Sequence, residues 1–310
     1  MTPPLFSVIL PTHNRATLLP RAIDSVLNQE LQDFELIVVD DGSTDGTAGV
    51  IARLPDDRLA FVRQDHSGVS AARNAGVALA IGRYVTFLDS DDQAHPDWLS
   101  RLGDAVERSG APLVSCGALF LSGRRRQRKA LPKRMGPEFD GAYGLFLAGT
   151  FAARRQLFIE VGGYEESLAF SENTELALRL IPICRRRGWP VQYIEQPLVS
   201  VCRRQRNGSH LMASFEAAKF LLETHGERLA RNSRVLSDYL AIAGVGAVRF
   251  ASRGEALGWF AKAIRARPQR IKNYLRWVAA RSPSLAARIW PLAETVKGHA
   301  IAAGSGEAWT

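Results

Sequence analysis

Short apolar runs alternate with amphipathic segments along the first hundred residues. Four of the runs have the length of buried strands: Phe6–Leu10, Phe34–Val39, Leu59–Val62 and Tyr84–Leu88. The segments between them place apolar side chains at helical spacing, over residues 18–27, 44–54 and 69–80. Strands without in–out alternation that alternate with helices are typical of a mostly parallel sheet covered on both faces. We therefore predict an α/β fold of Rossmann type.

The pattern changes twice further along the chain. From residue 113 to 201 it is mixed, with strands expected at Leu113–Leu121, Gln192–Glu195 and Leu198–Val201, a helix at Glu172–Ile183 and a basic loop at Gly123–Arg134. After Arg203 helices are expected over residues 212–224, 235–250, 255–266 and 271–280. We expect an α/β domain at 1–205, with halves at about 1–112 and 113–205, an α-helical C-terminal extension at 206–298 and a frayed tail at 299–310.

Charge divides along the same boundary. Residues 203–310 hold 18 Lys and Arg against 7 Asp and Glu, a net charge of +11, whereas the whole chain carries +9. A basic extension should attract an anionic partner. It has no recognition-helix signature or RNA-binding motif, so no nucleic acid is expected. Arg-rich amphipathic helices with interleaved aromatic residues can instead lie in an anionic membrane surface. The aromatic residues in question are Trp259, Phe260, Tyr274, Trp277 and Trp290. A helical bundle with a solvated basic face is the alternative.

Three cysteines, Cys116, Cys184 and Cys202, have the spacing of neither a disulfide framework nor a zinc site. No segment approaches the ~18 apolar residues of a spanning helix, and the N-terminus lacks the basic start of a signal peptide. We expect a cytoplasmic protein, peripheral on the inner face of the cytoplasmic membrane if the basic helices bind lipid.

Polar residues follow three of the predicted strands. Thr12-His13-Asn14 come after the first, Asp40-Asp41 after the second and Asp89-Ser90-Asp91 after the fourth. Ligands of parallel sheets bind beyond the carboxyl ends of the strands, so these side chains should share one site. Two carboxylates two residues apart can hold Mg²⁺ or Mn²⁺, with diphosphate oxygens completing the coordination shell.

Four successive segments resemble the ordered motifs of the family 2 glycosyltransferases, which have the GT-A fold. They are SVILPTHNR, VVDDGSTDGT, GVSAARNAG and YVTFLDSDD, and together they cover about residues 5–102. The likeness continues more loosely through residues 162–166 and 170–180. The resemblance implies a GT-A-like sheet and transfer of a hexose-type sugar, with inversion, from a nucleotide-diphosphate sugar.

The same resemblance assigns roles to individual residues. The nucleotide, expected to be UDP, would be held by Pro11, Thr12, His13, Asn14, Asp40, Asp41, Arg73 and Asp89. Within that set, Asp41 would accept a hydrogen bond from the base and Arg73 would lie near the diphosphate. Asp91 would bind Mn²⁺ or Mg²⁺ directly, and Asp89 would contribute to the same metal site. His210 would reach the metal from a loop that follows the sheet.

The catalytic base departs from the family pattern. In the family it is usually the aspartate of a Glu-Asp pair that begins a helix, but in this chain the pair is Glu172-Asn173. An asparagine cannot accept a proton, so we predict Glu172 as the base and Glu175, one turn further, as the reserve. The alternative is that Glu172 stabilises the helix N-terminus and Glu175 is a solvated surface residue.

The expected work is assembly of a cell-surface polysaccharide or a lipid-linked glycan. Two other interpretations compete with it. Nucleotidyl transfer would require a Gly-rich basic loop after the first strand, and PTHNR is not one. A catalytically silent protein that binds a sugar nucleotide stays open because of Asn173.

Overall fold

The computed structural model describes residues 2–122, 126–202 and 209–291. They fall into two compact units, divided between residues 204 and 205. The first unit contains a large mixed sheet, and the second consists of helices.

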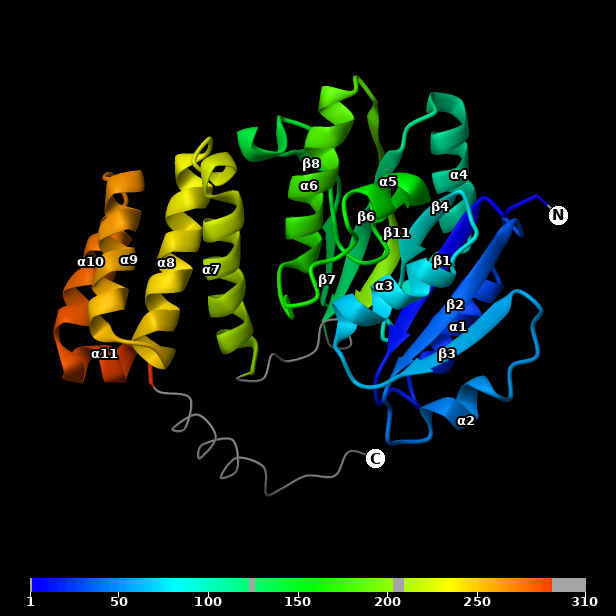
Figure 1. Ribbon diagram of the computed structural model, residues 1–310, viewed down its shortest axis with the longest axis horizontal. Coiled ribbons are helices and arrows are strands. Elements are labelled where there is room, and N and C mark those ends of the chain that lie inside the picture. Colours follow the sequence, from blue (N-terminus) through cyan, green and yellow to red (C-terminus); the bar gives the residue numbers. More distant parts are fainter. Residues whose placement is uncertain (1, 123–125, 203–208, 292–310) are drawn as a thin grey trace. The chain divides into compact units, whose positions relative to one another are not determined.

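The described part of the first unit contains a nine-stranded sheet (Figure 1). Its first half is parallel, in the order β3-β2-β1-β4. The bounds are β1 Phe6–Thr12, β2 Phe34–Asp41, β3 Leu59–Gln64 and β4 Tyr84–Phe87. The carboxyl ends of these four strands therefore meet at one edge of the sheet.

The second half of the sheet is mixed. Next to β4 the order continues β10-β6-β11-β5, and β7 pairs with β6. Strand β10 is antiparallel to both of its neighbours, whereas β11 is parallel to β6. The bounds are β5 Gln93–Ala94, β6 Leu113–Ser122, β7 Arg126–Ala130, β10 Phe151–Arg154 and β11 Val191–Cys202. A separate pair consists of β8 Lys133–Arg134 and β9 Tyr143–Gly144, with a 3₁₀ turn at Pro137–Phe139.

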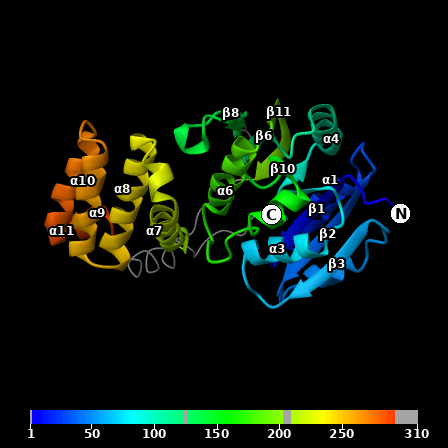
Figure 2. The same ribbon diagram turned by 45° about the horizontal axis from the view of Figure 1, so that its top comes forward.

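Helices cover both faces of the parallel half (Figure 2). On one face, Ile23 and Trp98 pack in the same core cluster as Val8 and Leu36. On the other face, Gly76 approaches Ile9 and Val39 so closely that a Cβ at this position would clash. The bounds are α1 Leu19–Leu27, α2 Thr47–Ile51, α3 Val69–Leu79, α4 Trp98–Ser109, α5 Arg155–Glu160 and α6 Glu172–Arg186. Of the apolar strands predicted from the sequence, β1, β2 and β4 are thus buried between two layers of helices, whereas β3 at the sheet edge is partly exposed.

The second unit is a row of helices in which each packs on the next along the chain. The bounds are α7 Ser209–Leu229, α8 Ser233–Phe250, α9 Arg253–Ala266, α10 Ile271–Arg281 and α11 Pro283–Ile289. Small residues allow close packing, since Gly244 contacts the ring of Phe260 and Gly246 that of Phe215. Across the described residues, none of the helices has the length and apolar character needed to cross a bilayer.

The predicted fold class is confirmed, and three details differ. The basic segment expected as a loop forms β7 and β8, because β7 occupies a sheet edge where Arg and Lys side chains remain solvated. The two strands expected between residues 192 and 201 are one irregular strand, β11, whose pairing register shifts near Pro197. The sequence analysis missed α4, α5 and β10, although Trp98, Leu99 and Leu102 have helical spacing.

Candidate functional site

Asn14 ties the end of β1 to the loop after β2. Its φ of +51° lies in the left-handed region, which asparagine adopts more readily than most residues. Its Oδ1 accepts a hydrogen bond from the Thr44 N–H at 2.8 Å, and its own N–H donates to Ser43 Oγ at 2.8 Å. Residues 11–14, predicted to bind a nucleotide, therefore lie directly beside the loop that follows Asp41.

Asp41 is buried at the tip of β2, and the loop between β3 and α3 surrounds its carboxylate. Its Oδ1 accepts from Gln64 Nε2 and from the Ser67 N–H, both at 2.8 Å. Its Oδ2 accepts from the Gly68 N–H at 2.9 Å and lies 2.8 Å from His66 Nδ1. Burial by itself raises the pKa of Asp41, but the bonds from Ser67, Gln64 and Gly68 outweigh it, so the pKa lies below its usual value. A carboxylate accepts about four hydrogen bonds, and this one is saturated.

His13 and His66 stack over the same loop, with ring centroids 4.2 Å apart. His13 Nδ1 lies 2.7 Å from the backbone oxygen of Asp41. Ligand atoms of His13, Asp41 and His66 lie within 4.8 Å of one another, a grouping that could hold a metal ion. A cation would have to displace the N–H donors of Asp41, so the donor set suits a cation poorly. The sequence analysis missed His66, whose only signal is an imidazole in a loop at a strand end.

Three buried polar atoms of the predicted nucleotide site have no hydrogen-bond partner within the part of the chain that the structure describes. They are Thr12 Oγ1, Asp40 Oδ2 and Arg73 Nε. Asp40 otherwise accepts from the Ser43 N–H at 3.0 Å, and its Oδ2 lies 3.7 Å from Arg63 Nε. Buried polar groups are rarely left without a partner, so these three atoms are candidates for ligand contacts.

Arg73 joins the end of β4 to the start of α6. The side chain is buried, and its guanidinium donates to Asp89 Oδ1 at 2.7 Å and to Glu172 Oε1 at 3.1 Å. The guanidinium also lies over the ring of Tyr164, 5.1 Å from the centroid. Burial lowers the pKa of Arg73, but the charges of Asp89 and Glu172 and the hydrogen bond to Asp89 raise it by more. Arg73, Asp89 and Glu172, which are far apart in the sequence, therefore form one network.

Asn173 holds the Glu172 carboxylate in place. Its Nδ2 donates to Glu172 Oε1 at 2.7 Å, and its Oδ1 accepts from the Tyr164 hydroxyl at 2.9 Å. Burial raises the pKa of Tyr164, so the hydroxyl stays a proton donor. The sequence analysis missed both positioning residues, although Tyr164 stands in the Gly-Gly-Tyr-Glu-Glu run.

Glu175 has different surroundings. It is buried on α6 and forms a bidentate ion pair with Arg179, whose Nε donates to Oε1 at 2.8 Å. Arg179 also donates to the backbone oxygen of Val161. These contacts give Glu175 a structural role, whereas Glu172 contacts the Arg73 network.

Asp89, Asp91 and Asp92 follow β4 within five residues. Burial and the charge of Asp89, with a smaller effect of Asp91, raise the pKa of Asp92 to about 8, although its Oδ1 accepts from the Cys202 N–H. Asp89 and Asp91 are partly exposed, so their oxygens can reach a ligand. Clustered carboxylate oxygens are the ligands that Mg²⁺ and Mn²⁺ prefer, and this group fits a divalent cation better than the saturated Asp41.

His210 lies in the first turn of α7, in the second unit, and is exposed. Its contribution to a metal site stays a prediction. The arginines at 203, 204 and 206, which precede His210 in the same basic stretch of the sequence, lie outside the described residues.

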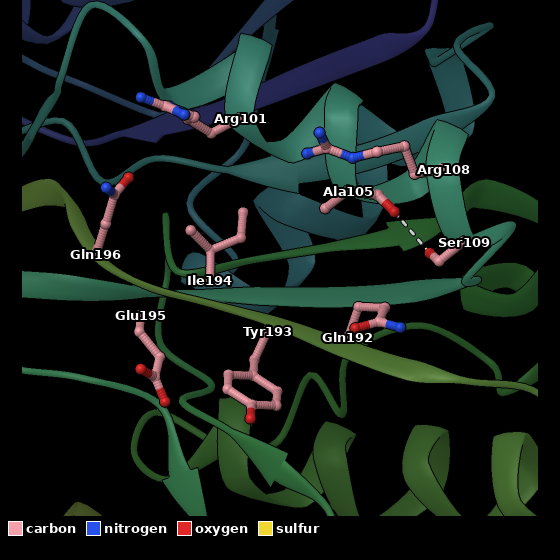
Figure 3. A pocket seen from close by; sticks show the side chains of 9 residues that line it. All are labelled: Arg101, Ala105, Arg108, Ser109, Gln192, Tyr193, Ile194, Glu195 and Gln196. Carbon is pink, nitrogen blue, oxygen red and sulfur yellow. Dashed lines mark hydrogen bonds between the residues drawn. The ribbon is translucent and has the colours of Figure 1, made fainter.

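A polar pocket of about 540 Å³ lies between α4 and β11 (Figure 3). Arg101 and Arg108 come from the helix, and Ile194 and Gln196 extend from the strand toward it. Cys202, at the end of β11, lies beside Asp92. Gln196 is six residues earlier on the same strand, which corresponds to about 20 Å between the two residues in an extended chain. This pocket is therefore separate from the strand-end site, and it contains no predicted site residue.

Comparison with known proteins gives a family match. Residues 7–163 match the model of the family described as glycosyl transferase family 2. The uncharacterized glycosyltransferase EpsJ of Bacillus subtilis is 37% identical over 126 residues, which are 40% of this chain and 36% of EpsJ. The succinoglycan biosynthesis protein ExoO of Rhizobium meliloti is 39% identical over 112 residues, 36% of this chain and 32% of ExoO. The matches thus span about a third of these curated relatives.

Solved structures show the same fold at low sequence identity. S. aureus TarS 1–349 in complex with UDP-GlcNAc gives a TM-score of 0.62 at 17% identity, over 96% of this chain and 92% of that chain. The mannosyltransferase PcManGT from Pyrobaculum calidifontis, in complex with GDP-Man and Mn²⁺, gives a TM-score of 0.56 at 20% identity, over 93% of this chain and 88% of that chain. The GT-A-like architecture expected from the motifs is therefore confirmed.

Proposed function

The chain belongs to glycosyl transferase family 2, whose model matches half of its residues, and from this membership we propose that it is a metal-dependent inverting glycosyltransferase. The donor is a nucleotide-diphosphate sugar, with UDP as the proposed nucleotide. The acceptor is a hydroxyl group of a cell-surface polysaccharide or a lipid-linked glycan. Support for the acceptor class comes from relatives named for succinoglycan and PGL/p-HBAD biosynthesis.

One observation carries the proposal: the buried guanidinium of Arg73 joins Asp89 at a strand tip to Glu172 at the start of α6. The two terminal nitrogens of one guanidinium thus hold Asp89, of the proposed donor site, next to the proposed base Glu172. The Nε of Arg73 is buried without a hydrogen-bond partner among the described residues, and the positive charge of the guanidinium fits its predicted position near the leaving diphosphate.

Each group of the site has a distinct task in the proposed reaction. Residues 11–14, Asp40 and Asp41 hold the nucleotide, and the exposed His66 must release Asp41 if the base is to bond to that carboxylate. Asp91, with Asp89 beside it, would hold Mn²⁺ or Mg²⁺, and the ion would supply positive charge to the departing diphosphate. Glu172 accepts the proton of the acceptor hydroxyl.

A thermal-shift titration tests the donor and metal parts of the proposal. We expect UDP with Mn²⁺ to raise the Tm of the wild-type protein, because a ligand that binds only the folded state stabilises it. Asp91→Asn should abolish the part of the shift that depends on Mn²⁺. The matched control is Asp57→Asn, since Asp57 is exposed and precedes β3, at the opposite edge of the sheet. An unchanged shift in Asp91→Asn would contradict the metal assignment.

Asn173 favours a second candidate, a protein that binds a sugar nucleotide without turnover. Saturation by UDP and Mn²⁺ with no release of UDP from any UDP-sugar, with or without acceptors, would support that candidate. Slow donor hydrolysis that is lost in Asp91→Asn would support the transferase.

A further inference from the structure

The last two helices of the second unit carry an exposed apolar face. Four residues of α10 follow the spacing i, i+3, i+4 and i+7, which places them on one side of the helix. On that side, Ile271 is 72% exposed, Leu275 63% and Val278 56%. The complete face consists of Ile271, Tyr274, Leu275, Val278, Leu285 and Ile289. An apolar surface of this kind marks an interaction site.

The orientation of α10 is fixed by a buried polar contact on its opposite side. Asn273 is fully buried, and its Nδ2 donates to Ser237 Oγ at 2.8 Å and to the backbone oxygen of Ala263 at 3.2 Å. Arg270, just before the helix, forms an ion pair with Asp238 of α8. The helix cannot roll to bury Leu275 and Val278 without leaving Asn273 without partners. The apolar face is therefore a stable feature of the unit.

The charged residues of the segment that carries this face have one sign. Residues 267–290 contain six Lys and Arg and no Asp or Glu. Lys272, Arg281 and Arg288 are exposed beside the apolar residues. A second copy of the chain would bring two basic surfaces together without a neutralising carboxylate from either segment. An apolar strip bordered by cations matches an anionic lipid surface instead.

The exposed face differs from the aromatic set expected from the sequence. Phe260 is fully buried, and Trp259, Trp277 and Trp290 pack around it in the core of the unit. Of the five aromatic residues only Tyr274 belongs to the exposed face. Membrane contact, if it occurs, must therefore depend on aliphatic residues of α10 and α11.

We propose that α10 and α11 dock on an anionic membrane surface, with Ile271, Leu275 and Val278 entering the interface between headgroups and acyl chains. The basic residues beside them bind the lipid phosphates. Docking needs neither donor nor acceptor, so it can be tested apart from the proposed catalytic activity.

Sedimentation with vesicles tests this proposal on the full chain. We expect the wild-type protein to pellet with vesicles of phosphatidylcholine and phosphatidylglycerol at low salt, and far less with phosphatidylcholine alone. Leu275→Glu/Val278→Glu should weaken the partition by about tenfold or more, because it removes apolar contact and adds negative charge. The matched control is Leu79→Glu/Ile242→Glu, which makes the same change at two exposed apolar positions of α3 and α8, outside α10 and α11, and should bind like the wild type.

Circular dichroism confirms that both double variants fold. Equal pelleting of Leu275→Glu/Val278→Glu and the wild type would overturn the proposal, as would failure of the wild type to pellet. Sedimentation velocity tests whether a second copy of the chain binds this face instead. If the wild type forms a dimer but does not bind vesicles, and the dimer is lost in Leu275→Glu/Val278→Glu, the face would be assigned to a second copy.

Discussion

At the scale of single residues, the site depends on carboxylates that have very different partners. Asp41 is saturated by residues at the end of β3 and in the loop before α3, Glu175 is paired with Arg179, and Glu172 shares Arg73 with Asp89. Similar side chains in the same site therefore have different tasks. Substitutions that keep the shape and remove the charge can separate these tasks.

Glu172→Gln should lower kcat by about 10²- to 10⁴-fold and leave nucleotide binding unchanged. The glutamine oxygen can still accept from Arg73 and Asn173, but the amide cannot take a proton. Steady-state kinetics measures kcat, and titration with UDP measures nucleotide binding. A variant with wild-type kcat would exclude Glu172 as the base.

Glu175→Gln is the comparison within the same helix. We expect a lower Tm with kcat largely retained, because the buried ion pair with Arg179 is lost while Glu172 keeps its contact with Arg73. Thermal unfolding and kinetics on the same preparation distinguish the outcomes. A loss of kcat without a change of Tm would make Glu175 the better candidate for the base.

Asp41→Asn should reduce the free energy of unfolding at neutral pH by about 1–3 kcal/mol, since the Ser67 and Gly68 N–H groups lose a charged acceptor. The folded-state pKa of Asp41 is lowered, so its contribution is complete above the unfolded pKa of about 3.9. It is lost as the pH falls through the folded value. Urea unfolding at several pH values should therefore show that the difference in free energy of unfolding between the wild type and Asp41→Asn becomes smaller below about pH 4. A constant difference across that range would contradict the assignment.

At the scale of elements, the loops after the strands hold the site together. The loop after β2 turns at Gly42, where φ is +75° and a Cβ would lie 2.8 Å from the His66 N–H nitrogen. Glycine is needed at this position for both reasons. The turn thereby allows the β3–α3 loop to approach Asp41.

Gly42→Ala should destabilise the protein by about 1–3 kcal/mol, through the strained φ and the contact with His66. Gly49→Ala is the control: Gly49 lies in α2 with open space around it, so alanine should be neutral or stabilising by up to about 1 kcal/mol. Denaturant unfolding of both variants measures the contrast. Equal stability of the two would refute the argument from the turn.

At the scale of the whole molecule, the two units separate the proposed tasks. Apart from His210, every predicted site residue lies in the first unit, whereas the exposed apolar and basic face lies in the second. Catalysis and membrane docking are therefore assigned to different parts of the chain.

A fragment of residues 1–204 should bind UDP and Mn²⁺ within about threefold of the affinity of the full chain, since it contains its own core and the nucleotide site. Calorimetric titration of both proteins makes the comparison. A loss of more than about tenfold, about 1.4 kcal/mol, would indicate that His210 or its neighbours contribute to the site.

The sequence by itself determined the alternating α/β order, the parallel sheet and the acidic strand ends. These features follow from local patterns: apolar runs, helical spacing and polar residues directly after a strand. The identity of Arg73 and Asp89 as site candidates also came from the sequence, through contiguous motifs.

Only the tertiary structure decided which carboxylates act together. Glu172 and Glu175 are three residues apart and equivalent in the sequence, but packing directs one to Arg73 and the other to Arg179. His66, Tyr164 and the exposed face of α10 are likewise set by contacts between segments distant in the chain. Such contacts depend on how helices and strands pack, and the pattern of neighbouring residues does not contain that information.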